Sequence, residues 1–433
     1  MAGKKIGKSD SNFSFINKLK NNKNLVQNFT SLSVLQISNY IFPIIVLPYV
    51  VRVLGPDKYG LVQFAAAFTA YLQLVCDYNF ALTGTRMISQ NRNDQKKLSE
   101  IFSSIILIKI TLFLITFVLF VTIIYSVEKF NSDSMVYILS TGMVLGSILS
   151  PLWFFQGIEK MKYITIIQVS VRIVATVFIF LLIQTSSDYL VLIIINSSAQ
   201  ITIGLIGLVV SIVMFKIKFV FPGKGMMINI LKHGWNIFLS SIWINFYTTS
   251  NTFLLGLFTN NTIVGYYAGA DKIRIAFQGI QSTLSLSVFP YVSNLVKESY
   301  ERFINFNKKL LRLSGIGGLI ISVLLFVFAD SLVDLILGKD FTNSANLLKI
   351  ISVLPFLISF SNVFGIQTML PLGFDKSFNK IIGLSSLIHI ILLLIIIPVY
   401  FAEGVAFTVV FTETIITISM IIFLRFKKIN LFV

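Results

Sequence analysis

The sequence predicts an all-α protein that crosses a membrane many times and has no soluble domain of ordinary size. Hydrophobic residues make up 55% of the 433 residues, charged residues make up 12%, and the mean hydropathy is +0.85. These values are typical of a polytopic membrane protein and exclude a soluble one. The long continuous apolar runs indicate helices, because a helix needs about 20 apolar residues to cross a bilayer and satisfies its own backbone polar groups.

Twelve segments have the length and composition of a membrane span. They are approximately 31–52, 60–83, 100–127, 135–156, 163–184, 189–215, 234–258, 263–296, 312–337, 347–371, 380–400 and 404–424. The connections between them are short, so we expect one membrane unit.

The distribution of Lys and Arg predicts the orientation, since these residues collect in cytoplasmic loops. With both termini in the cytoplasm, most of the 35 Lys and Arg residues fall in the tails and in the cytoplasmic loops. Four fall in the loops on the opposite side, namely Arg52, Lys58, Lys129 and Lys339. This pattern also accounts for the net charge of +17, so the basic composition does not call for a nucleic-acid partner.

The chain is expected to divide into two halves. We predict a basic cytoplasmic tail over 1–30, a six-helix half over 31–215, a cytoplasmic linker over 216–233 and a second six-helix half over 234–433. Because each half starts and ends in the cytoplasm, the two would form a parallel repeat. Asn39 precedes Gly60 by about the distance at which Asn245 precedes Gly265, which is weak support for such a repeat.

Charged residues inside the predicted spans are the strongest functional signal. Five are cations (Lys109, Arg172, Lys272, Arg274 and Lys349) and three are acids (Asp77, Asp271 and Glu413). Charges in a membrane are costly and usually face a cavity or a partner. The surplus of cations therefore predicts an anionic substrate.

The spacing of the charged residues shows which cations can pair with an acid on the same helix. Asp271 and Arg274 are three residues apart and can pair on one helix face, whereas Lys272 points about 100° away. Lys109 and Arg172 have no acid within four residues, so their counter-ions must come from another helix or from the ligand. Lys349 lies near the end of its span. Its side chain could extend to the membrane interface or face a cavity, and the sequence does not decide between the two.

Uncharged polar residues follow helical spacing in the same segments. Gln63 and Gln73 lie on the stripe that ends at Asp77, and Gln278 extends the stripe of Asp271 and Arg274. These stripes predict a water-filled cavity. Asn245, in the span 234–258, is also a candidate for it, although hydrogen bonding between helices is the favoured explanation for that span.

No catalytic or metal-binding motif is found in the sequence. Cys76 is the single cysteine, and His233 and His389 are the two histidines, so neither a metal site nor a cofactor is expected. His389 lies inside a span, where it would either relay protons or bond neighbouring helices as a neutral side chain.

Several blocks resemble a known family. The first contains Asn39-Tyr40, Pro48-Tyr49, Leu54-Gly55-Pro56 and Tyr59-Gly60, and is similar to the start of a Wzx-type O-antigen or oligosaccharide flippase. Blocks beginning at Asp77, Trp153 and Val264 extend the likeness over nearly the whole chain. Such flippases are polysaccharide biosynthesis proteins of the multidrug/oligosaccharidyl-lipid/polysaccharide (MOP) exporter superfamily. Asn79 stands where similar proteins often have glycine.

This resemblance implies a MATE-like fold and a non-enzymatic function. The expected activity is flipping an undecaprenyl-diphosphate-linked oligosaccharide from the inner to the outer leaflet of the bacterial cytoplasmic membrane, by alternating access, for surface polysaccharide synthesis. Lys109, Arg172, Lys272 and Arg274 would hold the diphosphate, and Gln63, Gln73, Asn245 and Gln278 would meet the sugars. Asp77, Asp271 and Glu413 are the candidates for a coupling proton or sodium site. Expected partners are membrane lipids, a polysaccharide polymerase and a chain-length regulator.

Three other functions remain open. A MATE-type ion-coupled multidrug exporter would share the fold, but a cavity for cationic drugs would favour acids. A membrane glycosyltransferase or polymerase would need a large external loop with a catalytic constellation. A channel would explain neither the half-repeat nor the scattered charges.

Overall fold

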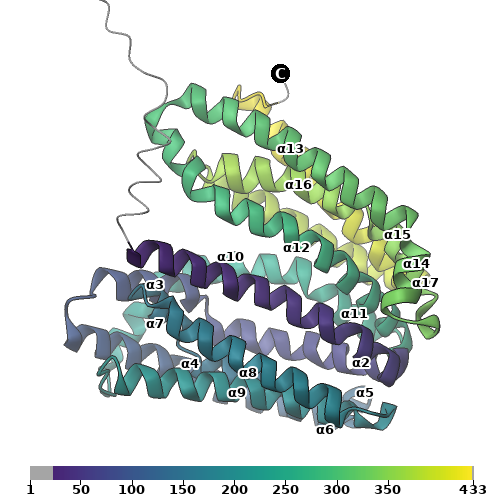
Figure 1. Cartoon of the computed structure of the whole chain (residues 1–433), viewed down its shortest axis with the longest axis horizontal. Helices are drawn as coiled ribbons and strands as arrows, with labels where there is room; N and C mark the ends of the chain where they lie inside the picture. Colours follow the sequence, from purple (N-terminus) through teal and green to yellow (C-terminus); the bar gives the residue numbers. More distant parts are fainter. Residues whose placement is uncertain (1–22, 432–433) are drawn as a thin grey trace, which may run out of the picture.

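The computed structural model describes residues 23–431, which form a bundle of helices without a strand (Figure 1). The predicted all-α class is therefore confirmed for this part of the chain. Most of the predicted basic tail over 1–30 lies outside the described residues.

One group of helices comes from the first half of the chain. Its members are α2 (Lys23–Asp77), α3 (Phe80–Gln90), α4 (Gln95–Ser126), α5 (Glu128–Asn131), α6 (Ser134–Leu149), α7 (Leu152–Gly157), α8 (Met161–Leu182) and α9 (Tyr189–Val213). Helix α2 packs against α4, α6 and α8, and α6 packs against α9. A short 3-10 turn, Ser186–Asp188, precedes α9.

The other group comes from the second half. Its members are α10 (Lys224–Thr248), α11 (Ser250–Phe258), α12 (Asn261–Glu298), α13 (Tyr300–Val327), α14 (Ala329–Ile336), α15 (Ser344–Ile351), α16 (Leu354–Phe364) and α17 (Asp375–Phe426). A 3-10 turn, Lys339–Phe341, precedes α15, and a π-helix, Gly365–Met369, follows α16. Because α10 begins at Lys224, the segment predicted as a linker over 216–233 is helical in its second part.

Eight helices among the described residues are long and apolar enough to cross a membrane. Two of them, Thr30–Gln90 and Asp375–Phe426, have 61 and 52 residues, well beyond the about 20 that one crossing needs. Each is interrupted by a non-helical residue, Gly55 with φ 68° and Phe401 with φ 47°. Each therefore contains two of the predicted spans. The count of twelve and the cytoplasmic placement of both termini stay predictions.

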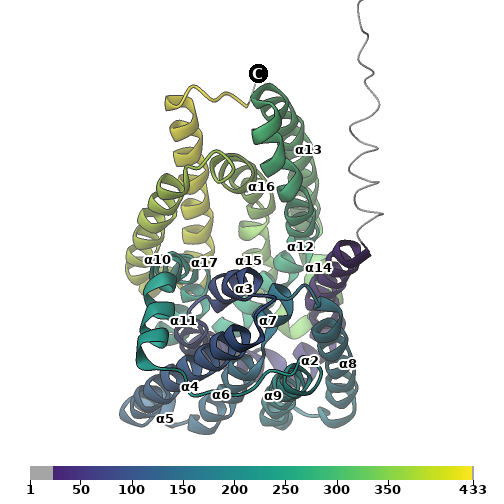
Figure 2. The ribbon, with the colours of Figure 1, turned by 90° about the vertical axis from the view of Figure 1, so that its left-hand side faces the viewer.

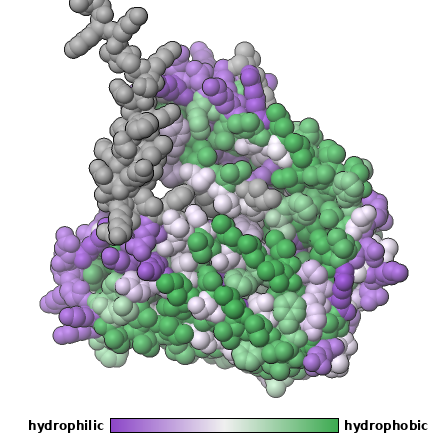
Figure 3. Space-filling model, viewed as in Figure 1, coloured by the Kyte–Doolittle hydropathy of each residue, from purple (hydrophilic) through white to green (hydrophobic). Residues whose placement is uncertain are grey.

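Apolar side chains cover the flanks of the molecule. In Figure 3 the hydrophobic colour extends over the sides, and the hydrophilic colour gathers at the two ends of the helices. Large exposed apolar residues include Leu114, Val118, Leu182, Val213 and Ile316. This distribution is what a surface in contact with lipid requires.

The two groups of helices meet at one end and diverge toward the other, with the exception of α10. Helix α10 stays in contact with the first group, because the Tyr78 and Phe238 rings stack with 4.4 Å between their centroids and Asn79 Nδ2 donates to Ser241 Oγ at 2.6 Å. Figure 1 shows the two groups close together at the right, near α11 and α14, and separated at the left, the end that faces the viewer in Figure 2. Gly60 of α2 and Gly265 of α12 lie where the two backbones are in direct contact. A Cβ added at Gly60 would overlap the Asn261 carbonyl oxygen, and one at Gly265 would overlap the Pro56 carbonyl oxygen. Small residues are what permit such backbone contact between membrane helices.

Two cations of the first group bind helix ends of the second group at this same end. The Arg52 guanidinium donates to the carbonyl oxygens of Asp334, at 3.4 Å, and Leu335, at the C-terminus of α14. Lys129 Nζ donates to the carbonyl oxygens of Leu257, at 3.0 Å, and Thr259, at 2.6 Å, where α11 ends. Cations are stabilised at helix C-termini by the exposed carbonyls and the helix dipole.

Candidate functional site

A cavity of about 500 Å³ lies between α2, α6, α8, α9 and α12. Its wall is mainly apolar, with side chains such as Val46, Ile179 and Ile275. Polar side chains also line it, from α2 (Asn39, Tyr40, Tyr59 and Gln63), α8 (Arg172 and Thr176), α9 (Asn196 and Gln200) and α12 (Lys272). An apolar cavity with a few polar groups converging on it is the usual form of a ligand site.

Arg172 is the charged residue that α8 contributes to this cavity. Its guanidinium donates to Asn39 Oδ1 of α2 and to Gln168 Oε1, one turn earlier on α8, at 3.4 Å. Within the described part of the chain, no carboxylate forms an ion pair with it. Arg172 is thus oriented by neutral amides and keeps its full charge available to a ligand.

Lys272 is the second charged residue of the cavity. Its side chain is exposed and has neither a hydrogen bond nor an ion pair with any described residue. Its neighbour Asp271 instead pairs with Arg274, as the spacing predicted. The cavity therefore contains two cations and no acid among its lining residues.

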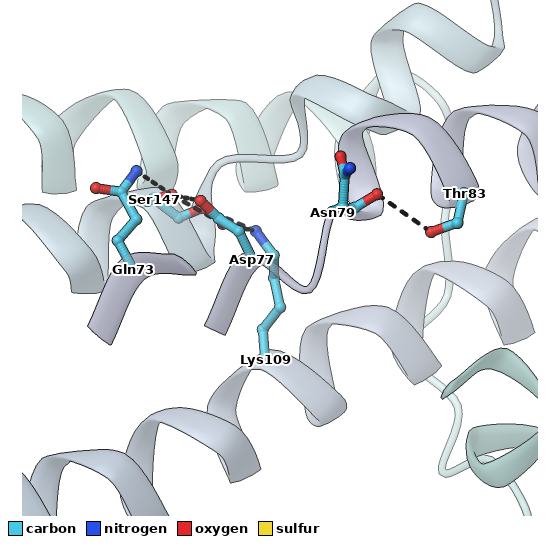
Figure 4. A network of polar contacts seen from close by, with 6 residues as sticks. All are labelled: Gln73, Asp77, Asn79, Thr83, Lys109 and Ser147. Carbon is cyan, nitrogen blue, oxygen red and sulfur yellow. Dashed lines mark hydrogen bonds and ion pairs between the residues drawn. The ribbon is translucent and has the colours of Figure 1, made fainter. Parts of the chain in front are cut away.

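Lys109 is neutralised by an acid from another helix (Figure 4). Its Nζ lies 2.8 Å from Asp77 Oδ1, at the end of α2, and 3.2 Å from the carbonyl oxygen of Ser147 on α6. The Ser147 hydroxyl donates to Asp77, and Gln73 Nε2 donates to that hydroxyl at 3.3 Å. The cluster ties three helices together beside the left-handed residues Tyr78 and Asn79, where α2 ends.

The remaining embedded cations are also paired. Arg274 Nε donates to Asp271 Oδ1 at 2.7 Å, and the guanidinium also donates to Gln278 Oε1. Lys349 Nζ lies 2.7 Å from Asp330 at the start of α14, with the carboxylate 69% exposed. Pairing thus removes Lys109, Arg274 and Lys349 from the surplus of embedded positive charge.

Comparison with known proteins identifies the family. A sequence profile described as "Polysaccharide biosynthesis protein" matches residues 25–296, more than half of the chain. The chain belongs to this family. A relative from Escherichia coli (strain K12), named "Putative O-antigen transporter", is 33% identical over 409 residues, covering 94% of this chain and 98% of the relative.

Solved structures show the same fold. An inward-facing MATE family multidrug resistance transporter of the MOP superfamily matches with a TM-score of 0.71 and 12% identity, covering 92% of this chain and 98% of its own. The lipid II flippase MurJ, in an inward closed conformation, matches with a TM-score of 0.70 and 13% identity, covering 92% and 87%. With the apolar helices, these matches show that this polysaccharide biosynthesis protein is a multi-pass membrane protein with the fold of these two transporters.

Glu413 is the embedded carboxyl that has no cation partner among the described residues of this family member. It is 4% exposed on α17. Tyr247 of α10 donates to its Oε2, and the Ser361 hydroxyl of α16 donates to its Oε1 at 2.5 Å. A hydroxyl group can donate a hydrogen bond to a carboxylate, and after rotation of its O–H bond it can accept one from a protonated carboxyl. The same neighbours can therefore hold Glu413 in either protonation state.

His389 lies beside this carboxyl in the same part of the second group. Its Nδ1 is 2.8 Å from Thr412 Oγ1, and its Nε2 is 2.9 Å from Asn251 Oδ1. Its ring meets that of Tyr247 edge-on at 5.3 Å. The side chain is fully buried and contacts both α11 and α17, so it has the role in bonding neighbouring helices that was one of the two alternatives for this residue.

The structure brings three of the predicted site residues into the cavity: Gln63, Arg172 and Lys272. Gln73 instead donates to Ser147 in the Lys109 and Asp77 cluster, and Gln278 accepts from Arg274 of the Arg274 and Asp271 pair. Asn245 Nδ2 donates to the Ser241 carbonyl of its own helix at 2.9 Å. Six polar residues of the cavity were not predicted as site residues: Asn39, Tyr40, Tyr59, Thr176, Asn196 and Gln200. Asn196 and Gln200 are four residues apart, and Tyr59 lies one turn before Gln63, so helical spacing could have identified these three.

Proposed function

We propose that this protein flips a polyprenyl-diphosphate-linked oligosaccharide, with undecaprenyl as the carrier, from the inner to the outer leaflet of the bacterial cytoplasmic membrane. The pair of cations without a carboxylate partner in the cavity, Arg172 and Lys272, carries this proposal. The name of the E. coli relative, an O-antigen transporter, and the fold shared with a lipid II flippase point to the same class of substrate. The flipped unit would be used for O-antigen or capsular polysaccharide.

The charge balance supports a diphosphate. Moving bare phosphate charges through hydrocarbon is prohibitive, and two cations inside the membrane can replace their hydration. The planar guanidinium of Arg172 suits bidentate binding to phosphate oxygens, and Lys272 supplies a compact charge from the opposite group of helices. The amides of Gln63, Asn196 and Gln200 would meet sugar hydroxyls, while the polyprenyl tail stays in lipid.

The contacts between the two groups of helices support alternating access. The groups are joined at the end that holds Gly60, Gly265, Arg52 and Lys129. Apart from α10, they diverge at the other end. With the predicted orientation, the joined end is external, so the cavity would load from the cytoplasm. Rocking the groups about the cavity would break these contacts and release the substrate outward. Outward movement of anionic charge is favoured by about 2.3 kcal/mol per charge per 100 mV.

The arrangement of the acids favours Glu413 as the coupling site. Asp77 and Asp271 are each held by a cation, so protonating either would leave a charge without a partner. Glu413 is held by hydroxyl groups alone, so binding a proton or a sodium ion there removes a buried charge. We therefore propose that Glu413 resets the carrier.

A MATE-type multidrug exporter is the alternative, and the fold fits it equally. Cationic drugs would meet two cations and no acid in the cavity, which disfavours their binding. An anionic lipid is therefore the better ligand.

The decisive experiment combines binding and function for Arg172→Ala, Lys272→Ala and the double variant. We expect undecaprenyl diphosphate to bind the purified protein, the single variants to lower its affinity about tenfold and the double variant more strongly. Surface polysaccharide should fall in parallel, in cells that depend on this protein. Lys349→Ala, which removes a cation paired outside the cavity, is the matched control and should change neither. Normal polysaccharide with the double variant would refute the proposal.

A further inference from the structure

The strap, residues 214–223, connects α9 to α10 and contains no helix. Figure 2 shows it crossing the end of the first group of helices. Two buried hydroxyl groups, one turn apart on α4, hold its backbone. Ser99 Oγ accepts from the backbone N–H of Lys218 at 3.1 Å, and Ser103 Oγ accepts from that of Val220 at 3.0 Å. The strap is therefore fixed to the first group of helices.

The fixed strap keeps three large apolar side chains at the surface. Phe219, Val220 and Phe221 are 50%, 39% and 83% exposed. Ile217, in contrast, is 2% exposed and packs in the core of the first group, so the strap has an inner and an outer side. Three neighbouring apolar side chains are unfavourable in water, because their surface is not removed from it. An apolar medium at this position would stabilise them.

The apolar surface of α9 leads directly to the strap. Ile212 and Val213, in the last turn of α9, are 47% and 69% exposed, and Met214, which begins the strap, is 53% exposed. These side chains belong to the apolar flank that lipid covers in a membrane protein. The strap therefore lies at the border between this flank and the polar end of the molecule, the depth at which interfacial segments insert apolar side chains.

Lysines accompany the apolar residues at this border. Lys216 and Lys218 lie in the strap, and Lys224 and Lys232 lie on the first turns of α10. All four are exposed, and none forms an ion pair with a residue that the structure describes. The sequence also has no Asp or Glu from 189 to 270. Clusters of lysines at a membrane surface attract anionic lipids, and each lysine strengthens that binding about fivefold.

We propose that the strap and the start of α10 bind anionic phospholipids of the leaflet at this end of the molecule. Phe219 and Phe221 insert at the boundary of the acyl chains, and the lysines contact the headgroups. With the predicted orientation, this is the cytoplasmic leaflet. The proposal goes beyond the proposed function, because these phospholipids are not the substrate and the cavity cations have no part in binding them.

Removing the charges tests the headgroup contact. The full-length protein is purified and offered equal amounts of phosphatidylglycerol, which is anionic, and phosphatidylethanolamine, which is zwitterionic. Native mass spectrometry then gives the ratio of the two lipids bound. We expect wild type to prefer phosphatidylglycerol, and the triple variant Lys216→Gln, Lys218→Gln, Lys224→Gln to lose this preference by about fivefold or more.

A matched triple variant controls for the loss of net charge. Lys297→Gln, Lys308→Gln and Lys309→Gln remove three cations near the connection between α12 and α13, where Glu298 and Glu301 are close in sequence. This variant should keep the preference for phosphatidylglycerol. Equal losses in the two triple variants would show that the strap is not a specific lipid site.

A spin label tests the apolar contact. A nitroxide is attached to Phe221→Cys in a Cys76→Ser background, and the protein is placed in nanodiscs that contain phosphatidylglycerol. Collisions with oxygen, which concentrates in lipid, are compared with collisions with a nickel chelate, which stays in water. We expect the label to lie deeper than one at Asn93→Cys, in the exposed turn before α4, and shallower than one at Ile320→Cys, which is 55% exposed on the apolar flank of α13.

The results decide for or against this site without reference to the cavity. A label at 221 that is as accessible to the nickel chelate as the label at 93 would place the strap in water, open to a soluble partner, and would overturn the inference. Wild type that shows no preference for phosphatidylglycerol would overturn it as well. Neither result would alter the flippase proposal, which depends on undecaprenyl diphosphate and on Arg172 and Lys272.

Discussion

Lys109 of α4 and Asp77 of α2 form an ion pair between the two helices, with 2.8 Å between Nζ and Oδ1. The lysine side chain is 4% exposed. The Ser147 hydroxyl and its carbonyl oxygen complete the contacts of both charges. A lysine that the sequence marks as an unpaired cation is thus a structural one. It joins α4, α6 and the end of α2 (Figure 4).

The first prediction concerns this pair. Asp77→Asn should destabilise the protein by about 2 to 3 kcal/mol, because it leaves the buried Lys109 without a counter-ion. The effect should fall below that of a fully buried pair, since the Asp77 side chain is 34% exposed. Thermal unfolding in detergent measures it. Asp330→Asn, which breaks the exposed pair with Lys349, should lower the stability by less than about 1 kcal/mol. Equal losses of stability in the two variants would contradict a structural role for the Lys109 and Asp77 pair.

The second prediction concerns the orientation of Arg172. Asn39→Ala removes the amide that holds the guanidinium while leaving its charge in the cavity. The affinity for undecaprenyl diphosphate should fall about threefold to tenfold, less than for loss of the charge itself. Asn245→Ala is the control, because that amide bonds within its own helix. Equal affinities for the two variants would show that Asn39 does not position Arg172 for the ligand.

The third prediction concerns ion coupling at Glu413. Glu413→Gln keeps the side-chain shape and the contacts with Tyr247 and Ser361 but cannot exchange a proton. In proteoliposomes, the transport rate of wild type should respond to an imposed proton or sodium gradient, and that of the variant should not. Glu403→Gln, an exposed position on the same helix, should behave as wild type. A gradient response that survives Glu413→Gln would remove this residue as the coupling site.

The fourth prediction concerns Lys129 and the joined end of the molecule. Lys129→Ala removes the contacts with the end of α11 and should shift the population toward the state open at that end. A cysteine placed at Gln63, in a Cys76→Ser background, would then react about fivefold faster with an impermeant thiol reagent added outside, a shift of about 1 kcal/mol. Lys339→Ala removes a different cation at the same end and is the control. Unchanged labelling in Lys129→Ala would show that this contact does not hold the end closed.

The fifth prediction concerns the glycine contact. Gly60→Ala places a methyl group on the Asn261 carbonyl oxygen, so the two groups of helices cannot approach as they do. We expect a loss of about 1 to 3 kcal/mol of stability, as for other overpacked sites. Gly317→Ala on α13 meets open space and should be neutral or stabilising. Thermal unfolding of the two variants compares them, and similar values would argue against a tight contact.

Hydropathy predicted the helical segments well, because a membrane imposes long apolar runs whatever the tertiary fold. It could not predict that the helix continues through the region between the first two segments, with a break at Gly55 alone. Local spacing predicted the Asp271 and Arg274 pair, since both residues lie on one helix face. The same spacing gave no information on Arg52, whose partners lie about 280 residues further along the chain.

The sequence by itself determined that this is a membrane protein and which charged residues lie within its helices. It also carried the likeness to polysaccharide biosynthesis proteins, the family that the comparison then established. Only the tertiary structure decided which cations face the cavity, because counter-ions come from helices distant in sequence. Asp77 neutralises Lys109 across two helices, whereas Asn39 reaches Arg172 with a neutral amide and leaves its charge free for a ligand.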